Sequence, residues 1–105
     1  MTRRRPRHKF NATRVEFDGI RFDSKKEASY YKKLRLRQQA GDILFFLRQV
    51  PFHLPGGVRY VVDFQEFHAD GTVHFVDVKG MQTPEFKAKK KMVEDLYRPV
   101  EIEIV

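Results

Sequence analysis

The sequence predicts a mixed α/β domain in which helices pack on a small central sheet. Residues 24–40 and 83–97 have the apolar spacing and the end signals of helices. Around and between them lie runs rich in β-branched and aromatic residues, which are typical of strands. The 105 residues suit one domain. We assign residues 1–9 to a polar, basic arm and residues 10–105 to the domain.

The first half of the chain is predicted to hold a hairpin and then a helix. Asp18-Gly19 separates two short alternating runs, a pattern that indicates two strands joined by a tight primed turn. Ser24 suits the N-cap of the helix, and Glu27, three residues later, completes a capping box. Gly41 is a suitable C-terminal stop.

The middle of the chain is predicted to be all β. Residues 43–54 are apolar but irregular and contain Pro51, so we expect one or two short strands there. Residues 59–67 and 72–79 form two strand-like runs separated by Ala69-Asp70-Gly71. Because that connection is so short, the two strands should pair antiparallel.

The last part of the chain is predicted to hold a second helix and a final strand. Thr83-Pro84-Glu85 supplies an N-cap, a proline for the first turn and an early acid. This helix should continue to about Tyr97, with Pro99 preventing its extension. Residues 100–104 alternate between apolar and acidic side chains, which predicts a half-buried strand.

The charge balance favours a polyanionic partner. Lys and Arg number 21 against 14 Asp and Glu, giving a net charge of +7. Such an excess favours nucleic acid, although association with ribosomes or solubility alone could produce the same balance. The absence of cysteine excludes thiolate metal sites and suits the cytoplasm. With no long apolar run and no signal peptide, no membrane association is expected.

Three charged residues on neighbouring strands form a candidate catalytic set. Because side chains alternate along a strand, Asp77 and Lys79 should share one face. Asp63 interrupts an apolar run, where an unpaired carboxylate is costly. It lies seven residues before Asp70, and Asp77 lies seven after, so the two acids should face each other across the hairpin.

Glu27 is the fourth candidate, although a capping box alone explains its presence. Its spacing to Tyr30, Tyr31 and Leu34 places it at the edge of the apolar helix face. Three carboxylates and a lysine suit a Mg²⁺ or Mn²⁺ site that activates water against a phosphate. Scattered structural charges are the alternative.

The chain resembles the PD-(D/E)XK nuclease superfamily. The likeness rests on Asp63, then Asp77-Val78-Lys79, with Glu27 matching the helical glutamate of many members. The wider series is similar to small phage-borne members that resemble Holliday junction resolvases. It comprises Val15-Glu-Phe-Asp-Gly-Ile-Arg-Phe-Asp-Ser-Lys-Lys-Glu-Ala, Tyr60-Val-Val-Asp-Phe, Val76-Asp-Val-Lys-Gly and Thr83-Pro-Glu-Phe-Lys. Val62 stands where the superfamily motif has a proline.

The resemblance implies a restriction-endonuclease-like core, with a central mixed sheet flanked by helices, and Mg²⁺-dependent hydrolysis of DNA. Asp63, Asp77 and Glu27 would bind the metal, and Lys79 would position the nucleophile. The implied substrate is branched DNA, such as a four-way junction. A homodimer is expected because symmetric cutting needs two active sites. A nicking or restriction-like nuclease on duplex DNA and a non-catalytic DNA-binding module remain alternatives.

Further basic and polar residues are candidates for DNA contact or for support of the site. The DNA-contact candidates are Arg3, Arg4, Arg5 and Arg7 in the arm and Lys87 and Lys90 in the second predicted helix. The alternative for this group is that the charged side chains are simply exposed to solvent and do not contact DNA. Gln49 is an auxiliary active-site candidate, with a structural hydrogen bond as its alternative. His53, His68 and His74 lack common metal-ligand spacing and are interpreted as structural or surface residues.

Overall fold

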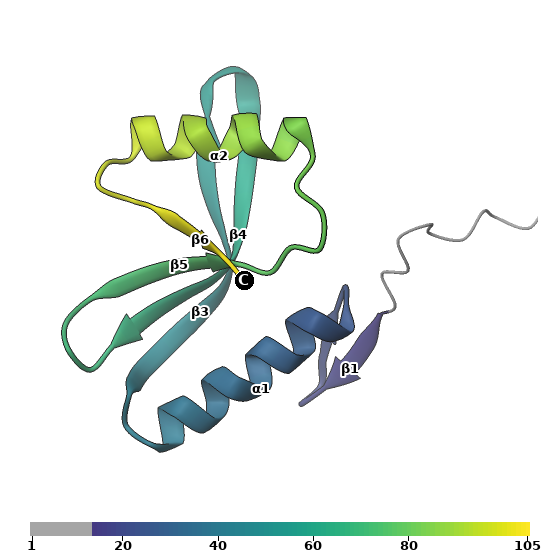
Figure 1. Cartoon of the computed structure of the whole chain (residues 1–105), viewed down its shortest axis with the longest axis vertical. Coiled ribbons are helices and arrows are strands. Elements are labelled where there is room, and N and C mark those ends of the chain that lie inside the picture. The colour runs from purple at the N-terminus through teal and green to yellow at the C-terminus, as the bar shows by residue number, and fades with distance from the viewer. Residues whose placement is uncertain (1–13) are drawn as a thin grey trace, which may run out of the picture. The chain divides into compact units, whose positions relative to one another are not determined.

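A computed structural model describes residues 14–105 (Figure 1). The chain forms two compact units, one ending at Lys33 and the other beginning at Leu34, so the boundary lies within a helix. No helix in residues 14–105 is long and apolar enough to cross a membrane. The predicted DNA-contact residues of the arm, Arg3, Arg4, Arg5 and Arg7, lie outside the described residues.

A β-hairpin opens the first unit, as predicted. Strands β1 (Val15–Phe17) and β2 (Ile20–Phe22) pair antiparallel. The residues between them, Asp18 and Gly19, have φ angles of 56° and 73°, which a primed two-residue turn requires. The ring of Tyr31 packs against this hairpin, with its centroid 5.1 Å from that of Phe22.

The first helix, α1 (Lys25–Gln39), begins and ends at the predicted signals. Ser24 Oγ accepts a hydrogen bond of 3.1 Å from the Glu27 backbone N–H, which confirms Ser24 as the N-cap. At the other end Gly41 has a φ of 90°, a conformation that favours glycine and terminates the helix.

The second unit contains a mixed four-stranded sheet in the order β3-β4-β5-β6. Its elements are β3 (Ile43–Leu54), η1 (Pro55–Gly57), β4 (Val58–His68), β5 (Val73–Asp77) and β6 (Ile102–Ile104). The first three strands pair antiparallel, and β6 joins β5 in parallel. The predicted mixed α/β class with a central mixed sheet is therefore confirmed.

Strand β3 differs from the expected one or two short strands. It is a single strand of 12 residues that pairs with β4 along its length. Pro51 is tolerated because β3 is an edge strand, where a missing N–H can face away from the sheet. An irregularity remains at Gln49, whose φ of 55° is uncommon for a residue other than glycine.

Helix α2 (Pro84–Leu96) covers the part of the β3–β4 hairpin that extends beyond β5 (Figure 1). Thr83 is its N-cap, with Oγ1 accepting from the Phe86 N–H at 3.1 Å. Val93 is fully buried against the hairpin. The core there consists of Phe52, Leu54, Tyr60, Val62, Val93 and Ile102. This packing positions the N-terminal turn of α2 beside the end of β5.

Removal of the α2 cap should destabilise the protein. Thr83→Ala leaves the Phe86 N–H without its side-chain acceptor, and we expect a loss of about 1 kcal/mol in the free energy of unfolding. Urea unfolding followed by circular dichroism measures it. Thr83→Ser keeps the acceptor and is the matched control; equal stabilities for the two variants would contradict this role.

Candidate functional site

Strands β4 and β5 stop pairing where the two candidate aspartates begin. Their last paired residues are Phe64 and Val76. In the same register, the next two positions are Asp63 and Asp77, so the acids face each other as the symmetry about Asp70 predicts. The candidate site therefore lies where the sheet divides.

The two aspartates are joined by reciprocal hydrogen bonds to the main chain. Asp77 Oδ1 accepts from the Asp63 N–H at 2.8 Å. Asp63 Oδ2 accepts from the Val78 N–H at 2.9 Å. Each carboxylate thus satisfies a backbone donor of the opposite strand at the point where ladder pairing ceases.

Two further side chains hold the remaining carboxylate oxygens. The Tyr60 hydroxyl donates to Asp77 Oδ2 within the core. Gln49 Nε2 donates to Asp63 Oδ1 at 3.4 Å, so the proposed auxiliary residue does contact one of the acids. Sequence reasoning missed Tyr60. Its signal was a tyrosine that alternates with Val62 on one strand face, since a buried tyrosine usually needs a partner for its hydroxyl.

Burial and like charge both act on this cluster. Burial raises the pKa of Asp63, and the neighbouring Asp77 carboxylate raises it further, against the lowering effects of the Val78 N–H and Lys79. Burial and the hydrogen bond to Asp77 raise the pKa of Tyr60 well above its usual value. The tyrosine therefore remains a hydrogen-bond donor at neutral pH.

Lys79 lies just beyond β5, not within it as predicted. Its backbone continues beside β6, because the Lys79 N–H donates to the Val105 carbonyl at 3.2 Å. The Val105 N–H in turn donates to the Asp77 carbonyl at 2.9 Å. Lys79 Nζ lies 4.8 Å from the centre of the Phe86 ring, a cation–π distance.

Asp77 and Lys79 line the same cavity, of about 270 Å³, between β4, the end of β5 and the start of α2. Tyr60 and Phe86 form aromatic walls, with ring centroids 5.9 Å apart. Arg59 also lines the cavity. Asp63 is not part of the lining and reaches the cavity only through its hydrogen-bonded partner Asp77.

Glu27 belongs to the first unit, where it is 6% exposed. Its backbone contact with Ser24 confirms its place in the N-terminal turn of α1. Its role as a metal ligand stays a prediction.

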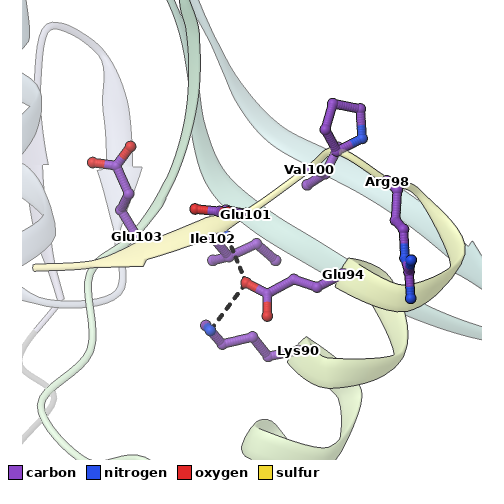
Figure 2. Close-up of a pocket in the computed structure, with 8 residues that line it drawn as sticks. Lys90, Glu94, Arg98, Val100, Glu101, Ile102 and Glu103 are labelled. Atoms are coloured by element: carbon purple, nitrogen blue, oxygen red, sulfur yellow. Dashed lines mark hydrogen bonds and ion pairs between the residues drawn. The ribbon is translucent and has the colours of Figure 1, made fainter.

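The two lysines predicted to contact DNA differ in their surroundings. Lys87 is exposed on α2. Lys90 Nζ lies 3.0 Å from Glu94, whose carboxylate also accepts from the Ile102 N–H at 2.8 Å (Figure 2). These contacts line a second cavity, of about 570 Å³, beside β6. Lys90 is thus paired within α2, with the glutamate that bonds α2 to the edge strand.

The donor chemistry suits a two-carboxylate metal site. Within residues 14–105, no group of three or more His, Cys, Asp or Glu is arranged to hold a metal ion. Asp63 and Asp77 nevertheless bring like charges together, and each carboxylate oxygen has a lone pair beyond the one used in its hydrogen bond. Mg²⁺ needs only one or two protein carboxylates, because it keeps several waters.

The positions of His53, His68 and His74 agree with their interpretation as structural or surface residues. His68 Nε2 lies 2.8 Å from the buried Glu66. His74 Nδ1 lies 2.6 Å from Glu103 and thereby links β5 to β6. His53 is exposed.

Tyr60→Phe should destabilise the protein by about 1–3 kcal/mol, because Asp77 Oδ2 loses its buried donor. Chemical denaturation measures the change. Tyr97→Phe is the matched control: its hydroxyl donates to the His53 carbonyl at the surface, where water can replace it. If the two variants lose equal stability, the buried hydrogen bond does not have this role.

Asp63→Asn should raise the melting temperature at neutral pH in metal-free buffer. The raised pKa means that the folded state binds this proton more tightly than the unfolded state. The charge on Asp63 therefore lowers stability above the folded pKa, and this cost fades as the pH falls towards the ordinary value of 3.8.

The gain from Asp63→Asn should consequently shrink on acidification, which melting curves across a pH series would measure. Asp95→Asn removes an exposed carboxylate paired with Arg98 and should change little at any pH. A pH-independent loss of stability in Asp63→Asn would contradict the electrostatic argument.

Comparison with known proteins assigns a family without assigning an activity. No curated protein and no solved structure matches the chain. One family model matches residues 7–105, nearly the whole sequence. The chain therefore belongs to the family described as "Protein of unknown function (DUF1064)".

Proposed function

We propose that this protein is a divalent-metal-dependent DNA endonuclease. The observation that carries the proposal is the pairing of Asp63 with Asp77 where β4 and β5 separate, with Asp77 and Lys79 lining one cavity. Two adjacent carboxylates beside a lysine suit hydrolysis of a phosphodiester. The net charge of +7 favours a polyanionic substrate.

Asp63 and Asp77 would hold Mg²⁺ or Mn²⁺. The bound ion would acidify a water molecule and offset charge on the phosphate. Lys79 orients the attacking water and stabilises the phosphate oxygens by its charge. Tyr60 and Gln49 hold the two carboxylates in position through their hydrogen bonds. As the water oxygen bonds to phosphorus, the water releases a proton; the ester P–O bond breaks and the leaving oxygen takes up a proton. The products are a phosphomonoester and a free hydroxyl group.

The substrate and assembly extend this proposal. Branched DNA such as a four-way junction is the substrate that the sequence resemblance favours. A homodimer would supply two active sites for symmetric cutting. The arm residues and Lys87 are proposed to contact the DNA backbone, whereas Lys90 is a weaker candidate because it pairs with Glu94. We place this activity in the cytoplasm.

A non-catalytic DNA-binding module is the second candidate. It is favoured by the four carboxylate oxygens of Asp63 and Asp77, each of which already accepts a hydrogen bond. Asp77 is also only 2% exposed. In this case the acids would stabilise the divided sheet and would not bind a metal.

Cleavage assays on a panel of DNA structures test the proposal. Labelled four-way junctions, nicked duplexes and linear duplexes are incubated with Mg²⁺, Mn²⁺ or EDTA. We expect metal-dependent cleavage, and a loss of at least ~100-fold in Asp77→Asn and Lys79→Met. Lys91→Met, at an exposed position of α2, is the control and should cleave normally.

Each outcome of this assay separates the candidates. A strong preference for the junction supports the resolvase proposal, whereas equal or better cleavage of linear or nicked duplex favours a restriction-like or nicking enzyme. Metal-independent binding without hydrolysis by the wild-type protein would reject the nuclease and support the binding module.

A further inference from the structure

The cavity beside Asp77 is lined by positively charged side chains that do not belong to the candidate catalytic set. Besides Lys79, the positively charged residues that line it are Arg59 and Lys89. Lys89 Nζ lies 3.2 Å from Glu85, its neighbour one helical turn away, so this charge is already paired. Asp77, which also lines the cavity, accepts hydrogen bonds from the Tyr60 hydroxyl and from the Asp63 N–H.

Arg59 has no such partner in the described part of the chain. No carboxylate among residues 14–105 forms an ion pair with it, and its exposed side chain lines the cavity. The guanidinium is permanently charged and presents planar donors that match two oxygens of a phosphate. An unpaired arginine beside a candidate phosphodiester site is therefore suited to bind substrate.

The backbone at Arg59 gives this charge a defined position. Arg59 lies on β4, in register with His53 of β3, in the part of β4 that continues beyond the end of β5. Its neighbour Tyr60 is buried and bonded to Asp77. A binding residue on a paired strand is held more firmly than one on a loop.

We propose that Arg59 binds a backbone phosphate of the DNA in the cavity beside Asp77 and Lys79. This inference rests on the proposed function for the identity of the polymer. Arg59 acts there as a binding residue that orients the phosphodiester, with Tyr60 and Phe86 excluding water from one side. It would not take part in proton transfer.

The test uses the full chain and measures binding separately from cleavage. Binding of labelled DNA is followed by fluorescence anisotropy in EDTA over a range of salt concentrations. Arg59→Gln should weaken binding about tenfold and reduce the salt slope by about one, because one phosphate contact is lost. Arg98→Gln removes the same charge from a residue paired with Asp95 outside this cavity, and it should do neither.

Arg59→Lys keeps the positive charge but loses the planar pair of guanidinium donors. It should therefore preserve the salt dependence of DNA binding while still lowering the affinity for DNA. It also keeps the proposal testable if Arg59→Gln fails to fold. Cleavage kinetics complete the set: Arg59→Gln should raise KM more than it lowers kcat.

The outcomes distinguish this inference from the nuclease proposal. Binding that depends on Arg59 without any hydrolysis by the wild-type protein supports the phosphate site and rejects the nuclease. Cleavage by the wild-type protein, with Arg59→Gln matching Arg98→Gln in affinity and slope, overturns the phosphate site alone. A wild-type protein that neither binds nor cuts DNA overturns both.

Discussion

The hydrogen bonds that join Asp63 to Asp77 and Val78 determine where the sheet of the second unit divides. Backbone N–H groups that leave a ladder inside a protein need another acceptor, and the two carboxylates supply it. Because those donors are satisfied, β4 can continue with β3 alone and receive α2 on one face. The same bonds bring the two aspartates together at the point where β4 and β5 separate. The atoms that satisfy the backbone donors are therefore also the atoms of the candidate site.

This arrangement has an electrostatic cost that the surrounding residues offset. Burial raises the pKa of Asp63, and repulsion from the neighbouring Asp77 carboxylate raises it further. Tyr60 and Gln49 each donate a hydrogen bond to one of the acids, and Gln49 does so from an unusual backbone conformation. A site that concentrates like charge is less stable than a neutral one, which is typical of sites retained for binding or catalysis.

Two of the cavities in the second unit differ in how their charged residues are paired. In the larger one, Lys90 and Glu94 pair with each other, and Glu94 also holds the edge strand (Figure 2). That surface is explained by the attachment of α2 to β6. In the smaller one, Arg59 lacks a carboxylate partner within residues 14–105, and Asp77 lies beside it. The larger cavity has the greater volume, but the chemistry of the lining residues favours the smaller cavity as the functional site.

The sequence by itself determined the features that depend on neighbours along the chain. Caps, turns and alternation defined the helix that begins after Ser24, the helix that begins after Thr83 and the opposed positions of Asp63 and Asp77, because a short hairpin sets its own register. Only the tertiary structure decided the single long β3, the end of β5 before Lys79 and the bond from Tyr60 to Asp77. These features depend on which strand is at the edge and on what α2 covers, and no local pattern specifies such long-range packing.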